Sequence, residues 1–295
     1  MNFGQVLTAM VTPFDQNGDI DFNATRTLVN YLIANGSDGL VVAGTTGESP
    51  TLTNNEKLDL FRFVAQVADG RAAVIAGTGS NSTWASIELT QQAEATGIDA
   101  IMLTTPYYNK PSQEGLYQHY KAIAQATSLP VMLYNVPGRS AVAIAPETTI
   151  RLSEISNIVS VKEASGNLDA MTEIVSKTSD EFTLYSGDDS LTLPALTIGG
   201  SGVISVASHI IGSDMKEMAQ SFKNGDVQNA AFIHQKLLPT MQALFAQPSP
   251  SPVKAALNMM GIYVGDVRLP MIPLSSEEKQ QLRQMLPPNQ ITEAG

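Results

Sequence analysis

The chain has 295 residues, 43% of them hydrophobic and 15% charged, a composition that supports a large apolar core and does not favour disorder. Against 17 Lys and Arg stand 28 Asp and Glu, and the net charge of −11 argues against nucleic acid or an anionic membrane as a partner. Without Cys, disulfides and thiolate metal sites are excluded, and a cytoplasmic location is expected. No apolar run approaches bilayer-spanning length, so no membrane segment is expected.

Short apolar runs rich in β-branched residues recur along the chain, each closed by a small or turn-forming residue. They predict eight buried strands over residues 6–13, 39–44, 73–79, 100–106, 131–137, 158–165, 182–188 and 202–208. Amphipathic patterns between them predict helices over residues 53–68, 82–96, 112–127, 146–155 and 168–178. Thr53 is the expected N-cap of the first of these helices, and Pro146 suits a first helical turn.

Eight strands that alternate with helices indicate an α/β fold, a (β/α)8 TIM barrel over residues 1–224. Three more helical patterns follow, over residues 226–246, 252–260 and 275–285. They predict a C-terminal helical appendage over residues 225–295. An open doubly wound sheet is the alternative, and it is less favoured because no Gly-x-Gly-x-x-Gly follows the first strand.

Tyr134 and Lys162 occupy two successive predicted strands, about one βα unit apart. Because side chains alternate along a strand, we expect both to point into the barrel from neighbouring strands. Burial favours the neutral amine that attacks a carbonyl, which makes Lys162 a candidate Schiff-base lysine. The alternative is a structural lysine paired with a buried carboxylate, although no inward acid is evident near it.

Polar segments follow the predicted strands at the C-terminal end of the barrel, where active sites lie. Thr45 and Thr46 stand between two glycines, a pattern that lets hydroxyls and backbone amides approach a carboxylate. Such a segment is also typical of a plain turn, in which Glu48 would cap the next helix. Tyr107 and Tyr108 suit either a catalytic role or an interface.

Arg139 follows Tyr134 closely and suits bidentate recognition of a carboxylate, the alternative being a surface salt bridge. Asp188 and Asp189 are metal-ligand candidates, but no His stands at ligand spacing and a turn-forming pair is favoured. We therefore expect no metal and no cofactor.

Five segments together resemble the dihydrodipicolinate synthases, members of the pyruvate-dependent aldolase superfamily that also contains N-acetylneuraminate lyase. They are Gly-Thr-Thr-Gly-Glu at 44–48, Thr-Pro-Tyr-Tyr-Asn at 105–109, Tyr-Asn-Val-Pro-Gly-Arg at 134–139, Val-Lys-Glu-Ala-Ser-Gly-Asn at 161–167 and Gly-Val-Ile-Ser at 202–205. Further matches at 109–117 and 268–271 extend the resemblance over nearly the whole chain. The resemblance implies condensation of pyruvate with L-aspartate 4-semialdehyde to 4-hydroxy-tetrahydrodipicolinate, the first committed step toward diaminopimelate and lysine, without a cofactor.

The resemblance also implies which residues carry the covalent and proton-transfer steps. Lys162 would hold the pyruvate as an imine. Tyr134 would relay protons during imine formation and cyclisation, with Thr45 linking it to Tyr108 of the partner subunit. A homo-oligomer, either a dimer or a tetramer, is therefore implied as well.

Substrate binding is implied for a second set of residues. Thr46 would hold the pyruvate carboxylate through its hydroxyl and backbone, and Arg139 would bind the carboxylate of the semialdehyde. Gly187 and the backbone of Ile204 would line the pocket.

Feedback inhibition by lysine is predicted to be weak or absent. Relatives that are inhibited have histidines at the positions of Asn54 and Lys57 and a glutamate at that of Ala85, which accepts the ammonium of the ligand. This chain keeps Ser49 and Tyr107 but has no carboxylate at position 85. Its Lys57 adds a cation that repels the cationic ligand.

Two other functions are compatible with part of the pattern. A sugar-acid aldolase or lyase would share Lys162 and Tyr134 but bind a longer polyhydroxylated substrate. Arg139 and the Thr45 and Thr46 pair favour the synthase, because sugar-acid members usually vary there. A non-catalytic barrel that binds a keto acid as a sensor is the alternative from a different class.

Overall fold

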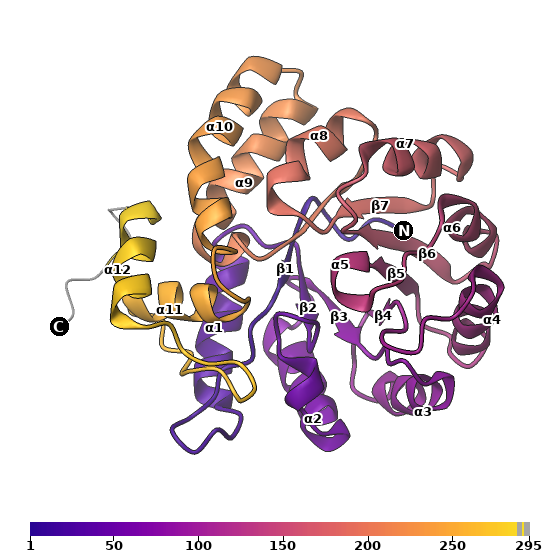
Figure 1. The fold of residues 1–295 in the computed structure, drawn as a ribbon, viewed down its shortest axis with the longest axis horizontal. Helices are drawn as coiled ribbons and strands as arrows, with labels where there is room; N and C mark the ends of the chain where they lie inside the picture. Colours follow the sequence, from indigo (N-terminus) through magenta and orange to yellow (C-terminus); the bar gives the residue numbers. More distant parts are fainter. Residues whose placement is uncertain (288–290, 292–295) are drawn as a thin grey trace.

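The computed structural model of the chain describes residues 1–287 and residue 291. Eight parallel strands form a closed barrel in chain order, and β1 completes the ring by pairing with β8. The strands are β1 (Val6–Ala9), β2 (Gly39–Val42), β3 (Ala73–Gly77), β4 (Ala100–Thr104), β5 (Val131–Asn135), β6 (Ile158–Glu163), β7 (Thr183–Ser186) and β8 (Gly202–Ser205). Figure 1 shows the helices arranged around this ring. The predicted (β/α)8 barrel is confirmed.

The barrel has two apolar layers because its strands are buried on both faces. Inside the ring, side chains such as Leu7, Ile75 and Met132 pack against one another. Outside it, residues of the opposite faces, such as Val42 and Leu133, pack against the surrounding helices. Each predicted strand begins near the observed one but extends too far. After β1, for example, residues 10–14 are also buried, so hydrophobicity alone does not mark where pairing stops.

Helices follow the strands, and those predicted from the sequence end within a few residues of their predicted bounds. The barrel helices are α1 (Phe22–Ala34), α2 (Asn54–Ala68), α3 (Thr83–Glu94), α4 (Gln113–Ala124), α5 (Pro137–Ser140), α6 (Pro146–Ser153), α7 (Leu168–Lys177), α8 (Thr192–Thr197) and α9 (Ser208–Lys223). Thr53 caps α2 in a reciprocal capping box with Glu56, which confirms its predicted role. Short 3-10 turns cover Ser49–Thr51 and Asp189–Leu191.

Four helices have no counterpart among the predicted helices, the short α5 and α8 and the longer α1 and α9. Helix α1 is capped by Asp21 but contains several β-branched residues, which weaken the helical signal. Helix α9 begins inside a run predicted as strand, and its backbone departs from helical geometry at Ile211, followed by Gly212. Both are helices because their apolar faces pack on the barrel, as Leu28 and Met215 do in the outer core.

The C-terminal helices α10 (Val227–Ala243), α11 (Ser251–Met259) and α12 (Ser276–Met285) lie at one side of the barrel, on the left of the view in Figure 1. Helix α10 packs beside α9, and α11 contacts both α9 and α12. Of the predicted appendage, residues 288–290 and 292–295 lie outside the described residues. Among the described residues, no helix combines the length and the apolarity needed to cross a membrane.

Candidate active site

Tyr134 and Lys162 are register partners on the paired strands β5 and β6. Both side chains are 5% exposed, and the Lys162 Nζ lies 4.3 Å from the centroid of the Tyr134 ring. The two strands are adjacent in the barrel because they are consecutive in the chain and joined by a helical crossover. Since Tyr134 and Lys162 are directly opposite each other in this pairing, both side chains point to the same inner face. The predicted phenol and amine pair is therefore formed inside the barrel.

Apolar neighbours surround this pair. Met132 and Val136 lie two residues to either side of Tyr134 on the same face, and both belong to the inner core of the barrel. Ala164, directly after β6, packs against that core, while the Ser160 hydroxyl in β6 donates to the carbonyl of Thr183 at 2.9 Å. The Lys162 amine is thus enclosed by the inner face of the barrel and is shielded from bulk water.

Asp188 corrects the expectation that no acid lies near Lys162. The residue follows β7 and is half-buried. Burial raises the pKa of the Asp188 carboxyl above its usual value, and the charge of Lys162 acts on it in the opposite direction. The next residue, Asp189, is buried and accepts hydrogen bonds from the backbone N–H groups of Val206 and Ala207 at 3.3 and 2.9 Å. The turn predicted for this acidic pair is present as the 3-10 turn at Asp189–Leu191, and closure of the ring brings it beside β6 and β8.

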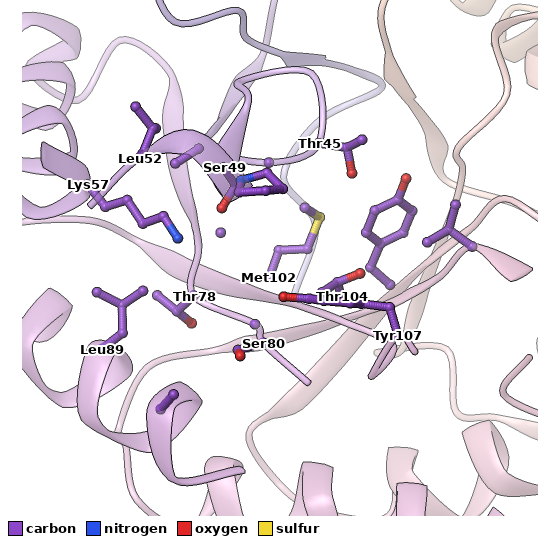
Figure 2. Close-up of a pocket in the computed structure, with 18 of the residues that line it drawn as sticks. Thr45, Ser49, Leu52, Lys57, Thr78, Ser80, Leu89, Met102, Thr104 and Tyr107 are labelled. Atoms are coloured by element: carbon purple, nitrogen blue, oxygen red, sulfur yellow. The ribbon is translucent and has the colours of Figure 1, made fainter. Parts of the chain in front are cut away.

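A cavity of about 450 Å³ opens above the inner pair at the C-terminal end of the barrel. Tyr134, Thr45 and Arg139 are among the residues that line it, as are Ser49, Lys57 and Ala85. Figure 2 shows Thr45 and Lys57 approaching the cavity from opposite sides. The structure thus brings residues from β3, β4, β5, α2, α3 and α5, and from the turn after β2, around one space.

The turn that follows β2 carries the predicted pair of threonines. Thr46 is 5% exposed and Thr45 is half-buried at the edge of the cavity. The turn is closed by a hydrogen bond from the Glu48 N–H to the Thr45 carbonyl at 3.1 Å. The alternative in which Glu48 caps the next helix is wrong, because Thr53 caps α2 and the Glu48 side chain makes a buried ion pair with Lys254.

Gly187 directly follows β7, the strand that pairs with β6 on the side away from β5, and Ile204 is in β8, the next strand of the ring. A Cβ atom on Gly187 would approach the Lys162 Cε to 3.1 Å and the Ala164 Cβ to 2.5 Å, so only glycine leaves the lysine its space. Ile204 is fully buried in the inner core, where β8 pairs with β1. Gly187 therefore lies against Lys162, and Ile204 belongs to the same inner core as Tyr134.

Arg139, Tyr107 and Tyr108 lie at the exposed rim. Arg139 is in the short helix α5, which begins two residues after β5, and it is exposed while lining the cavity. Tyr107 also lines the cavity, whereas Tyr108 is 89% exposed and has a φ of 72°. The large ring of Tyr108 is thus exposed on a left-handed backbone that a residue with a side chain seldom adopts.

Comparisons with known proteins agree with this geometry. The model of the Dihydrodipicolinate synthetase family matches residues 2–288. The chain belongs to this family. It is 62% identical over 288 residues to the 4-hydroxy-tetrahydrodipicolinate synthase 1 of Halalkalibacterium halodurans, covering 98% of each chain.

Solved structures of related proteins have the same fold. A dihydrodipicolinate synthase of Bacillus anthracis is 58% identical and superposes with a TM-score of 0.95, over 97% of this chain and 98% of that one. A dihydrodipicolinate synthase of Cyanidioschyzon merolae, solved with lysine bound, is 48% identical with a TM-score of 0.94, over 96% and 97%. The family and the fold indicated by the sequence motifs are confirmed.

Proposed function

We propose specific roles for the site residues in the reaction of this enzyme, the condensation of pyruvate with L-aspartate 4-semialdehyde to 4-hydroxy-tetrahydrodipicolinate. Relatives that share about 60% of their residues over nearly the whole chain are synthases of that product. The reaction proceeds through a lysine Schiff base and belongs to lysine biosynthesis. The observation that carries the assignment of roles is the Tyr134 and Lys162 pair inside the barrel.

Lys162 is the nucleophile of this proposal. Its Nζ attacks the C2 carbonyl of pyruvate, and a water molecule leaves as the imine forms. The imine withdraws electrons, so the pyruvate methyl group loses a proton and becomes an enamine carbon that attacks the aldehyde. The amino group of the bound semialdehyde then closes the ring on C2 and displaces Lys162.

Tyr134 carries protons during these steps, since its ring lies beside the Lys162 amine. A phenol alone is a weak base near neutral pH, but a chain of hydroxyls can pass its proton toward solvent. Thr45 at the cavity edge is the proposed link. The third hydroxyl is Tyr108 of the partner subunit, so we propose that the enzyme works as a homo-oligomer. The exposure of Tyr108 supports this assignment.

Four residues bind the substrates in this proposal. The Thr46 hydroxyl and backbone hold the pyruvate carboxylate at the end of β2. Arg139 binds the carboxylate of the semialdehyde, supported by its place on the cavity wall near Tyr134. Gly187 and the backbone of Ile204 shape the inner wall, supported by the narrow space between Gly187 and Lys162.

The sugar-acid aldolase and the keto-acid sensor are less well supported. The close relatives of this chain are synthases, and the site offers an exposed arginine on the cavity wall for a second carboxylate. An assay coupled to the downstream reductase with authentic semialdehyde tests the choice. Turnover with the semialdehyde but not with N-acetylneuraminate is expected. Turnover of the sugar acid alone would contradict the proposal.

The proposal also covers the division of the chain into domains and its location in the cell. We take residues 1–224 as the catalytic barrel and residues 225–295 as its helical appendage, because the residues that form the site all precede position 225. A cytoplasmic location is proposed because the chain has no Cys and its product enters amino-acid biosynthesis.

A further inference from the structure

Glu48 takes no part in the roles proposed so far, although it follows the Thr45 and Thr46 turn directly. Its carboxylate forms an ion pair with Lys254 of α11, and their Oε1 and Nζ atoms are 2.8 Å apart. The two side chains are only 1% and 2% exposed. An ion pair buried this deeply joins the turn after β2 to the C-terminal helices.

The surroundings of this pair satisfy both charges. The second carboxylate oxygen of Glu48 accepts the backbone N–H of Arg268 at 2.8 Å. The Lys254 Nζ also donates to the carbonyl of Asp266 at 2.8 Å and lies 4.2 Å from the centroid of the Phe14 ring. Buried charges remain in a core only when such partners are present, so the pair has a built environment.

Arg268 attaches the same C-terminal segment to the loop between β2 and α2. Its guanidinium donates to the carbonyls of Thr51 and Gly18, each at 2.8 Å, and forms an ion pair with Glu56. The segment also approaches Phe14 closely, since a Cβ atom on Gly265 would lie 1.9 Å from the Phe14 carbonyl oxygen. Several independent contacts therefore fix where Lys254 and Arg268 meet Glu48.

The backbone at Glu48 transmits this anchoring to the threonines. Glu48 has a φ of 57°, a left-handed conformation that a residue with a side chain adopts only when its surroundings hold it there. Its N–H closes the turn on the Thr45 carbonyl at 3.1 Å, and the Thr12 hydroxyl donates to the carbonyl of Gly47 at 2.7 Å. A change in the Glu48 side chain therefore alters the turn that contains Thr46.

We propose that Lys254 is a positioning residue for pyruvate binding. Its buried ion pair with Glu48 holds the turn after β2 in the conformation in which Thr46 receives the pyruvate carboxylate. This inference rests on the role proposed above for Thr46. It gives a function in the reaction to the C-terminal helices and to the segment around Arg268, which lie outside the catalytic barrel.

The test compares Lys254→Met with a matched control, Lys216→Met. Lys216 of α9 forms an ion pair with Asp38, which precedes β2, so the control breaks an ion pair at the opposite end of the same strand. For each protein, the pyruvate concentration that gives half of the maximal borohydride-trapped adduct is measured, together with the KM of each substrate, kcat and Tm.

Lys254→Met is expected to raise the half-saturating pyruvate concentration about ten-fold or more, because small displacements of binding groups have large effects. The KM for the semialdehyde should change less. Lys216→Met should lower Tm while leaving the pyruvate dependence within about two-fold of the parent. If Lys254→Met lowers Tm but leaves the pyruvate dependence unchanged, the ion pair is only structural and the inference is wrong.

The double variant Glu48→Gln with Lys254→Met covers the case in which the single variant does not fold. Without an unpaired buried charge its Tm should recover, whereas its half-saturating pyruvate concentration should stay raised. Parent-like pyruvate binding in this variant would overturn the inference. Thr46→Val separates the two proposals. If Thr46→Val binds pyruvate like the parent, the role of Thr46 fails; if only the Lys254 variants do, the positioning role fails.

Discussion

Two lysines near the C-terminal end of the barrel have contrasting surroundings. Lys162 projects from β6 inside the ring, where its amine lies beside the Tyr134 ring and near the Asp188 carboxyl. Lys57 projects from α2 toward the cavity (Figure 2). Its amine forms no ion pair with any described residue. Burial lowers the pKa of Lys57. On the neighbouring helix α3, Ala85 offers no carboxylate to compensate the charge.

The comparison shows that the strand or helix that carries a lysine determines which groups surround its amine. Strand register places Tyr134 directly beside Lys162, so the proposed nucleophile has the proposed proton carrier at a fixed position. The helix surface that carries Lys57 faces a wide opening, and no acidic residue lines the cavity around it. The proposed covalent chemistry therefore lies at the inner pair, whereas the cavity wall at Lys57 has a cation that no described acid neutralises.

The largest expected effect comes from Lys162→Ala. Loss of the only proposed nucleophile should lower kcat by a factor of about 1,000 or more. Pyruvate with borohydride should add one reduced adduct per chain to the parent at Lys162, and none to the variant, as mass spectrometry will show. Lys57→Ala is the matched control and should keep the adduct. An adduct that persists undiminished in Lys162→Ala would contradict the assignment.

Tyr108→Phe tests whether one chain completes the site of another. The variant should be nearly inactive because the hydroxyl relay is broken, while still forming the pyruvate adduct on Lys162. Mixing it with Lys162→Ala chains should restore part of the activity, since a hybrid dimer contains one site with both groups intact. Subunit exchange must be confirmed independently. No recovery after confirmed exchange would exclude donation of Tyr108 between subunits.

Inhibition by free lysine tests the part of the cavity that Lys57 and Ala85 line. A relative from Cyanidioschyzon merolae has been solved with lysine bound. Here the missing carboxylate and the charge of Lys57 should weaken lysine binding by roughly ten-fold to a hundred-fold. Lysine is titrated into the coupled assay at saturating pyruvate. The triple variant Asn54→His, Lys57→His and Ala85→Glu should gain sensitivity, and half-inhibition of the parent at sub-millimolar lysine would contradict the prediction.

Lys57→Met should have the smallest effect, an increase in the free energy of unfolding of about 0.5 kcal/mol at neutral pH. The lowered pKa of Lys57 means that the folded chain loses this proton at lower pH than the unfolded chain. The parent therefore gains stability as pH rises through that range, and the advantage of the variant should shrink. Denaturant unfolding at neutral and alkaline pH measures this.

A matched control for that measurement is Lys177→Met. Lys177 is exposed and paired with Glu173 on α7, so its removal should bring no gain in stability. An equal gain in both variants would mean that the effect comes from hydrophobic substitution at any lysine and not from the unpaired charge of Lys57.

Local sequence patterns predicted much of the fold, because apolar runs mark buried strands and capping residues mark where helices begin. Eight apolar runs gave the eight strands, and capping residues such as Thr53 gave helix starts. Helices α1 and α9 were not predicted, since their stability comes from packing on the barrel more than from local propensity. Strand ends were also misplaced, because the loops at the C-terminal end are as buried as the strands.

The sequence by itself determined the barrel, the family and the Tyr134 and Lys162 pair, because alternation along neighbouring strands fixes which side chains share the inner face. It did not place Asp188 near Lys162 or join Glu48 to Lys254. Those contacts link residues distant in the chain and depend on ring closure and on where the C-terminal helices pack. No periodic pattern encodes such distances, so only the tertiary structure decided them.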